Sequence, residues 1–206
     1  MPKIDLRKEL KPLYTASPKK AALLEIPRMK FLMIDGSGHP DGNPLFQQGM
    51  EALFGVAYTL KFSSKLGPEK LDWTMMPSEA MWWVEGSQSF EKADKSAWRW
   101  TLMIAQPDAV TSAMVREAKK TLKEKKNPAR VDEVRLESLR KEQCVQILHI
   151  GPYNAEQPAI DKLHAFAAEN GYQIAGRHRE IYFSDPKRTK PEKLKTILRF
   201  AVSKRV

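Results

Sequence analysis

One pattern occurs twice along the 206 residues, and it restricts the fold more than any other feature of the chain. Residues 30–34 form an apolar, strand-like segment that ends in a Gly/Pro-rich loop and continues into a helical pattern over 45–60. Residues 147–150 lead through a Gly-Pro turn into a second helical pattern over 155–170. Two strand-like segments follow each helix. The sequence therefore predicts a β-α-β-β unit that is used twice.

The repeat predicts an α+β fold, in which tandem pseudo-twofold β-α-β-β repeats form antiparallel sheets. We expect a ligand cleft between the two halves, because binding sites favour such junctions. The first 25 or so residues are rich in Lys and Pro and predict an extended N-terminal arm (1–25) before the main domain (26–206). Within that domain the first repeat is expected at about 28–126 and the second at about 130–206. The other expected segments are strands at 71–76, 81–85, 98–105, 131–139, 143–150, 178–183 and 196–202, and a helix at 107–126.

Composition indicates a packed protein of the cytoplasm. Hydrophobic residues make up 42% of the chain, which is enough for one compact body or two small halves. The single cysteine, Cys144, excludes an internal disulfide and a Cys-rich metal site, and it is expected to be a small buried thiol. The N-terminus has no apolar signal region, and no apolar run approaches the ~18 residues of a membrane span.

The net charge of +10 is concentrated at the two ends of the chain. Residues 1–30 hold 8 Lys/Arg against 3 acids, or +5, and residues 177–206 hold 10 against 3, or +7. The remaining middle therefore carries 17 against 19, or −2. No zinc-finger spacing, helix-turn-helix or RNP-type motif accompanies this charge, so nucleic acid is a disfavoured partner.

Several kinds of site are poorly supported. The four histidines lack metal-ligand spacing, so we predict neither a metal nor another cofactor. The segment Gly36–Gly38 lacks the further Gly, Lys and Ser/Thr of a phosphate loop. Ser37 has no nucleophile elbow around it, which argues against a serine hydrolase.

Glu180 is the candidate for chemistry. It belongs to the strand-like run 179–183 (REIYF), where alternation puts Glu180 and Tyr182 on the face opposite to two apolar side chains. A carboxylate beside aromatic rings needs water or a ligand. The simpler alternative is an ion pair with Arg179, Arg199 or Lys195, and both interpretations stay open at this point.

Tryptophans supply a candidate aromatic wall. Trp83 and Trp100 are as compatible with a pocket as with a core, whereas Trp82 and Trp98 favour a core. Flat aromatic faces bind planar or cationic molecules. Tyr153 follows a Gly-Pro turn where a strand end leads into a helix, which is a usual position for the rim of a pocket.

Four blocks of sequence carry a resemblance to a known family. They are residues 82–83 (WW), 100–108 (WTLMIAQPD), 146–153 (QILHIGPY) followed by Glu156, and 178–186 (HREIYFSDP) followed by 194–199 (LKTILR). Together they resemble the stand-alone branch of the GyrI-like small-molecule-binding domain family, over about 30–202.

The resemblance implies a tandem SHS2-type repeat with an acid at the pocket centre, which maps onto Glu180. Relatives fused to DNA-binding domains are multidrug sensors in which this acid meets cationic aromatic ligands, but this chain shows no helix-turn-helix module. Other relatives inhibit DNA gyrase through features that this sequence does not display. Some stand-alone members are similar to hydrolases that open the cyclopropane ring of DNA-alkylating natural products. This chain has Arg179 where many stand-alone members have His.

We therefore expect a flat hydrophobic or cationic small molecule as the partner, bound by Trp83, Trp100, Tyr153 and Tyr182. Glu180 is expected to act as the catalytic base that hydrolyses cyclopropanoid alkylating compounds, a detoxification of xenobiotics. The alternative is a protein that binds, sequesters or senses such molecules without turnover. The oligomeric state stays open, and a monomer is compatible with the sequence.

Overall fold

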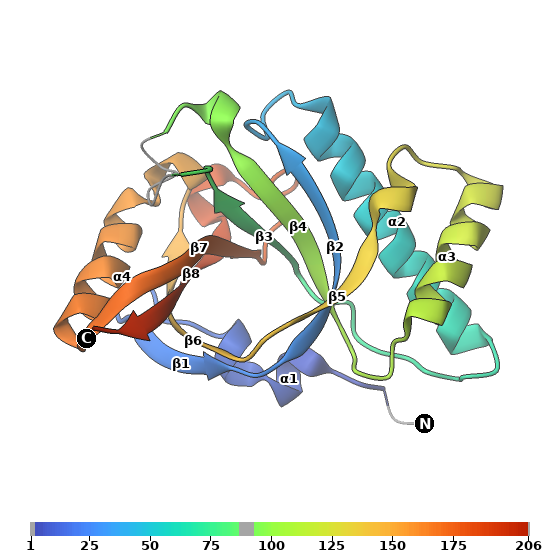
Figure 1. Ribbon diagram of the computed structural model, residues 1–206, viewed down its shortest axis with the longest axis horizontal. Coiled ribbons are helices and arrows are strands. Elements are labelled where there is room, and N and C mark those ends of the chain that lie inside the picture. Colours follow the sequence, from blue (N-terminus) through green and yellow to red (C-terminus); the bar gives the residue numbers. More distant parts are fainter. Residues whose placement is uncertain (1–2, 87–92, 206) are drawn as a thin grey trace. The chain divides into compact units, whose positions relative to one another are not determined.

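The structure is a computed structural model that describes residues 3–86 and 93–205 (Figure 1). The chain divides into two compact units. Unit 1 consists of Met1–Glu9, Met29–Met76 and Trp82–Leu139, and unit 2 of Leu10–Arg28, Pro77–Met81 and Arg140–Val206. Each unit combines helices with antiparallel strands, which confirms the predicted α+β class.

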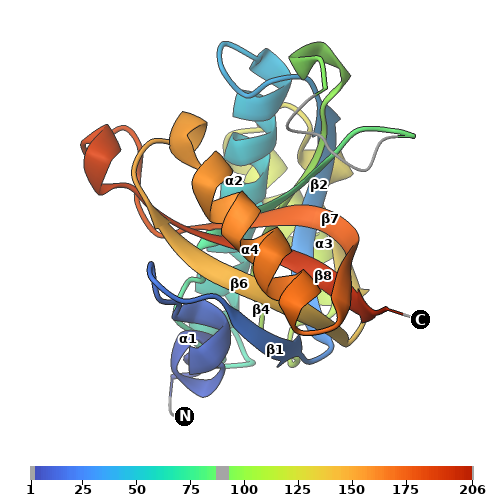
Figure 2. The same ribbon diagram turned by 90° about the vertical axis from the view of Figure 1, so that its left-hand side faces the viewer.

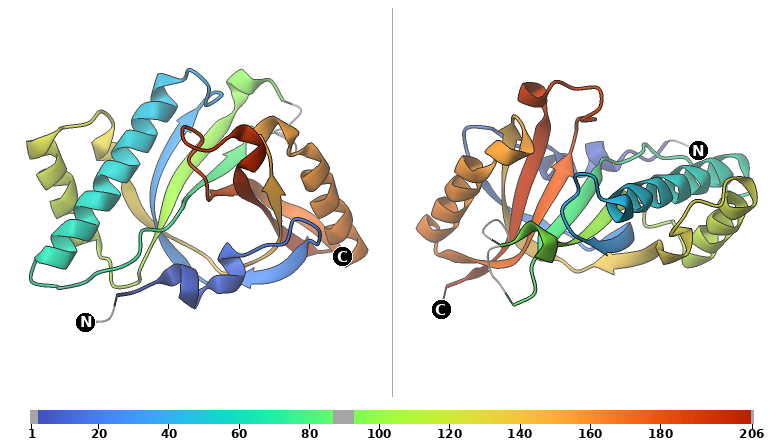
Figure 3. Two further views of the ribbon diagram at one scale, coloured as in Figure 1. Left: turned by 180° about the vertical axis from the view of Figure 1, so that it is seen from behind. Right: turned by 90° about the horizontal axis from the view of Figure 1, so that it is seen from above.

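Unit 1 contains antiparallel strands in the order β4-β2-β5, and α2 and α3 lie side by side (Figure 3). The elements are α1 (Leu6–Glu9), β2 (Met29–Ser37), α2 (Pro44–Leu66), η2 (Lys95–Ala97), β4 (Arg99–Gln106), α3 (Ser112–Lys125), η3 (Val131–Glu133) and β5 (Arg135–Leu139). The N-terminus of α2 is fixed locally, because the Asn43 side chain accepts a hydrogen bond from the Leu45 amide at 2.9 Å. Pro44 occupies the first turn, where its missing N–H costs nothing.

Unit 2 contains antiparallel strands in the order β1-β6-β8-β7, and Figure 2 shows α4 lying across β6, β7 and β8. The elements are η1 (Lys11–Tyr14), β1 (Ala22–Ile26), β6 (Glu142–Ile150), η4 (Tyr153–Ala155), α4 (Gln157–Glu169), β7 (Tyr172–Tyr182), η5 (Pro191–Lys193) and β8 (Lys195–Lys204). The strand β3 (Ser78–Trp83) contributes its first four residues to unit 2 and its last two to unit 1.

The predicted β-α-β-β pattern occurs in the order β2-α2-β3-β4 and again in the order β6-α4-β7-β8. The strand that precedes each repeat, however, pairs with the other repeat. β1 precedes the first repeat and pairs with β6, where Leu24 lies opposite Cys144. β5 precedes the second repeat and pairs with β2, where Leu136 lies opposite Leu32. The periodicity of a strand does not show with which strand it pairs. The boundaries predicted for the two repeats, 28–126 and 130–206, therefore do not show that β1 and β5 each pair with a strand of the other repeat.

The N-terminal segment differs from the predicted extended arm (1–25). It contains α1, η1 and the beginning of β1. Leu13 and Tyr14 are buried, and the carbonyls of Pro12 and Thr15 accept hydrogen bonds from the Gln146 side-chain amide at 2.9 and 3.2 Å. Burial of Leu13 and Tyr14 and the hydrogen bonds of the Gln146 amide stabilise η1 within unit 2.

Two further segments differ from expectation. The predicted strand over 71–76 is a loop in which only Trp73 forms a bridge, with Ile4. The strand expected at 81–85 begins earlier, at Ser78. Among the described residues, no helix is long and apolar enough to cross a membrane.

The sheet of unit 2 has two different faces. The α4 face carries an apolar core of Val145, Ile147, Ile160, Leu163, Ala167, Tyr172, Leu198, Phe200 and Val202. Because opposite residues of antiparallel strands share a face, Glu180 (opposite Leu198) and His178 (opposite Phe200) belong to the α4 face. Arg179, between them, points to the other face.

Candidate functional site

Three titratable side chains meet at one end of the α4 face of unit 2. Glu156, His178 and Glu180 bring one potential ligand atom each to within 4.8 Å of one another. His178 and Glu180 are two residues apart on β7, and Glu156 is the N-cap residue of α4. Their exposed fractions are 6%, 2% and 7%, so all three side chains are buried.

His178 is the hydrogen-bond partner of Glu180. Its Nε2 lies 3.1 Å from Glu180 Oε1, and its ring meets the edge or face of Phe200 at a centroid distance of 4.7 Å. In the tautomer protonated at Nε2, the imidazole donates to the carboxylate and holds its orientation. The cationic partners considered from the sequence for Glu180 were Arg179, Lys195 and Arg199. All three lie on the opposite face by alternation.

Glu156 is a buried acid. Burial, and next the charge of Glu180, raise the pKa of Glu156 to about 10. Its Oε1 is buried and has no hydrogen-bond partner among the described residues. Both effects favour the protonated form of Glu156. Two carboxyl groups whose surroundings differ in this way are suited to separate acid and base roles.

Tyr153 and Tyr182 complete the site in unit 2. Their rings meet edge to face at a centroid distance of 5.9 Å and an angle of 85°. Tyr182 follows Glu180 on the same face of β7, and Tyr153 begins η4, three residues before Glu156. Burial, and next the charge of Glu180, raise the pKa of Tyr153 to about 12, so its phenol remains an O–H donor. The structure thus brings three of the predicted site residues together.

The predicted tryptophans belong to unit 1. Trp100 is fully buried, and a Cβ added at Gly36 would lie 2.1 Å from its ring. Phe46 meets the Trp100 ring at 5.3 Å, and the guanidinium of Arg130 lies 5.8 Å from it. Trp100 packs as a core side chain of that unit. Its contact with a ligand stays a prediction.

Trp83 is half-buried and its Nε1 donates to Glu85 Oε1 at 3.3 Å. Its role as part of a ligand wall also stays a prediction. Trp82 is 4% exposed and contacts Trp98 at 5.6 Å.

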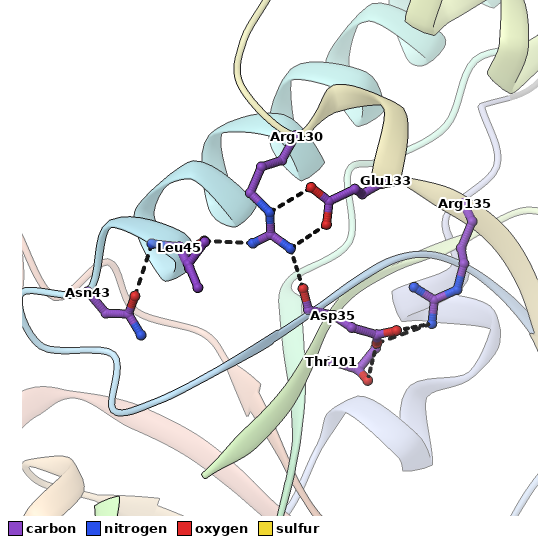
Figure 4. A network of polar contacts seen from close by, with 7 residues as sticks. All are labelled: Asp35, Asn43, Leu45, Thr101, Arg130, Glu133 and Arg135. Atoms are coloured by element: carbon purple, nitrogen blue, oxygen red, sulfur yellow. Dashed lines mark hydrogen bonds and ion pairs between the residues drawn. The ribbon is translucent and has the colours of Figure 1, made fainter. Parts of the chain in front are cut away.

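Figure 4 shows the polar network that holds Arg130 in place in unit 1. Arg130 pairs with Glu133 and donates to the carbonyls of Asp35 and Leu45. It therefore ties η3 to the end of β2 and to the first turn of α2. Arg135 adds an ion pair with the Asp35 carboxylate at 3.0 Å. These contacts are structural.

Two residues of the cluster were not among the predicted site residues. His178 could have been found from the alternation that was applied to Glu180, since residues two apart on a strand share a face. The structure shows that the imidazole beside Glu180 comes from His178. Glu156 lies 24 positions before Glu180 and no local pattern joins them.

The cluster also contains the donor types of transition-metal sites. One imidazole and two carboxylates are ligands that zinc and related ions use in proteins. Glu156, His178 and Glu180 are the group among the described residues that could hold such an ion. Without a metal ion, a proton on Glu156 would neutralise one of the two carboxylate charges of the cluster.

Cys144 is buried, and burial raises the pKa of its thiol to about 11. A protonated thiol is a poor nucleophile, in keeping with the structural role expected for it.

The chain is similar to several known proteins. A model of the GyrI-like small molecule binding domain family matches residues 21–203. An uncharacterized conserved protein from Listeria innocua is 37% identical, with a TM-score of 0.89 over 98% of this chain and 100% of the other. A hydrolase encoded by lin2189 of the same organism is 36% identical, with a TM-score of 0.87 and the same coverage. The C-terminal domain of EcmrR shares the fold, at 14% identity and a TM-score of 0.54 over 90% of this chain and 98% of that domain. No curated protein matches the chain.

Proposed function

Because the chain belongs to the GyrI-like small-molecule-binding family, we propose that it hydrolyses cyclopropanoid DNA-alkylating compounds by ring opening. The observation that carries the proposal is the buried pair of a protonated Glu156 and a hydrogen-bonded Glu180. Such a pair supplies an acid and a base in one place. The similarity to a Listeria innocua hydrolase over almost the whole chain supports turnover rather than binding alone.

The residues around Glu180 are suited to bind a flat hydrophobic or cationic molecule. Tyr153 and Tyr182 present two rings at right angles, and Glu180 adds a negative charge beside them. Flat hydrophobic molecules gain from contact with such rings, and cationic ones gain further from the rings and the carboxylate.

The reaction begins with water. Glu180 accepts a proton from a water molecule whose oxygen attacks the CH₂ carbon of the cyclopropane ring. A C–O bond forms, a strained C–C bond breaks, and its electron pair moves into the conjugated ring system to place negative charge on the carbonyl oxygen. His178 keeps the Glu180 carboxylate oriented during this step.

The oxyanion is then neutralised. Glu156 donates its proton to that oxygen, and the Tyr153 phenol can donate a hydrogen bond to the same developing charge. The net change is the addition of one water molecule to the substrate. Proton transfer from Glu180 to Glu156, whose oxygens lie within 4.8 Å, restores the starting state.

A positioned general base contributes about 10²–10⁴-fold to a rate. That contribution is sufficient here because ring strain already favours opening. The scheme uses side chains of unit 2 and water alone.

Incubation with a cyclopropanoid alkylating compound tests this function. We expect the wild-type protein to convert excess compound into its hydrated, ring-opened product, measured by mass spectrometry. Glu180→Gln keeps the size of the side chain but cannot act as a base, so the rate should fall by about 10²–10⁴-fold. Glu169→Gln, an exposed residue at the end of α4, is the matched control and should remain active.

The second candidate is binding without turnover, which needs only the tyrosine pair and the Glu180 charge. Recovery of unchanged compound from a stable complex with the wild-type protein would establish this alternative and contradict hydrolysis.

A further inference from the structure

The face of the unit 2 sheet that points away from α4 contains a pocket. It has a volume of about 200 Å³ and is lined by Met81, Glu142, Gly176, Arg177, Arg179, Arg199 and Ala201. Drug-sized ligands occupy pockets of ~300–1,000 Å³, so this one suits a smaller molecule. Among the described residues, its walls carry three guanidinium groups and one carboxylate, an excess of positive charge.

One of these guanidinium groups is balanced inside the protein. Arg179 is 4% exposed, and its Nε donates to Glu79 Oε2 at 2.7 Å. Glu79 is fully buried and also accepts from the Tyr14 hydroxyl at 3.1 Å. Glu142 lies 3.8 Å from Arg179 at the pocket and is only partly buried. Glu79 therefore neutralises Arg179 from within.

Arg199 is not balanced in the same way. It is 1% exposed, and its hydrogen bonds go to the neutral Oε1 of Gln146, at 3.1 and 2.7 Å, and to the Leu13 carbonyl. Among the described residues no carboxylate forms an ion pair with it. Burial, and next the charge of Arg179, lower the pKa of Arg199. A buried cation beside another cation favours an anion in the adjoining pocket.

A β-bulge in β7 forms part of the wall of the pocket. The pairing of β7 with β8 shifts register between Ile174 and His178, which marks a β-bulge. Gly176 lies in the bulge, and a Cβ added there would come within 2.6 Å of the Ala201 Cβ. Arg177 follows it, lines the pocket and remains exposed to solvent. The bulge thus adds an accessible guanidinium to the two buried ones.

We propose that this pocket binds a small oxyanion, such as a phosphate or a carboxylate group. Guanidinium groups match the geometry of such oxygens with pairs of N–H donors. The site is separate from the acid cluster, because Arg177, Arg179 and Arg199 do not share the face of Glu180.

Calorimetric titration with inorganic phosphate tests the proposal, with sodium chloride at the same ionic strength as the reference. We expect saturable binding of phosphate at one site per chain. Arg177→Gln removes one charge-assisted hydrogen bond and should weaken binding about tenfold. Glu142→Gln removes the one carboxylate of the pocket and should strengthen binding several-fold.

Arg188→Gln is the matched control. It removes the same charge from an exposed loop residue of unit 2 and should leave phosphate affinity unchanged. Absence of saturable binding would overturn the proposal. So would equal losses in Arg177→Gln and Arg188→Gln, which would mean that phosphate responds only to the net charge of +10. Ring-opening activity is measured separately, so failure of one proposal leaves the other assessable.

Discussion

Glu156 and Glu180 are chemically identical side chains that the fold places in different surroundings. Glu180 receives a hydrogen bond from the imidazole of His178, whereas Glu156 Oε1 is buried and has no described partner. The surroundings of Glu156 raise the pKa of its carboxyl group, first through burial and next through the charge of Glu180. Their consequence for stability can be measured without knowing the substrate.

The raised pKa of Glu156 predicts a loss of stability at high pH. Its pKa is about 10 in the folded protein and about 4.3 when unfolded, so between these values only the folded state holds the proton. The free energy of unfolding then falls as the pH rises, by up to about 1.4 kcal/mol per pH unit. Glu156→Gln is always neutral and should lose this component. Urea unfolding of both proteins between pH 6 and 9 measures the difference.

Glu169→Gln, at an exposed position, should follow the wild-type pH dependence. Parallel curves for wild type and Glu156→Gln would show that Glu156 is ionised in the folded protein, contrary to the proposed acid.

At the residue scale, alternation along one strand was sufficient to place Glu180 and Tyr182 on a common face. The same alternation also places His178 on that face. It gives no information about Glu156, because the N-cap residue of a helix approaches a strand only through tertiary packing.

At the scale of elements, the pairing of β2 with β4 depends on a glycine. Gly36 lies opposite Trp100, and an added Cβ would lie 2.1 Å from the indole. Gly36→Ala should therefore destabilise the protein by about 1–3 kcal/mol, the usual range for overpacking, measured by urea unfolding. In a Trp100→Phe background the smaller ring should reduce the cost of Gly36→Ala. Equal costs in both backgrounds would show that the indole is not the obstacle.

The η1 segment makes a second prediction. The Tyr14 hydroxyl donates to the fully buried Glu79, which is shared with Arg179. Tyr14→Phe keeps the ring but leaves the buried carboxylate with one donor fewer, so the free energy of unfolding should fall by about 1–3 kcal/mol. Tyr58→Phe, on an exposed position of α2, is the control and should change little. No effect of Tyr14→Phe would mean that the hydrogen bond from Tyr14 to Glu79 does not stabilise the fold.

Elements with local signals were predictable, and those defined by long-range pairing were not. Asn43 and Pro44 mark the start of α2 through a side-chain cap and a fixed φ, both of which are local. β1 and β5 each pair with a strand of the other repeat, and this pairing depends on contacts between residues far apart in the sequence. η1 was predicted as part of an extended arm because its Lys and Pro content hides the burial of Leu13 and Tyr14.

For the molecule as a whole, the repeat was visible in the sequence, and the match over 21–203 shows the family. The acid cluster lies entirely within unit 2, so the proposed chemistry depends on the second copy of the repeat.

If the chain and water are sufficient for hydrolysis, metal removal should leave the activity intact. We expect the rate of ring opening after dialysis against EDTA to equal the rate after dialysis against the zinc–EDTA complex, whose chelating groups are already occupied by zinc. A loss that is reversed by added Zn²⁺ would instead assign Glu156, His178 and Glu180 to metal ligation.

The most direct measurement is a single turnover of a cyclopropanoid in ¹⁸O-labelled water, with protein in excess and the product analysed by mass spectrometry. Attack by water that Glu180 deprotonates predicts one ¹⁸O in every ring-opened product molecule, and formation of that product about 10²–10⁴-fold more slowly with Glu180→Gln. Product that lacks ¹⁸O in the first turnover, or a covalent adduct on Glu180, would show that the carboxylate itself attacks the ring and would contradict the proposed mechanism.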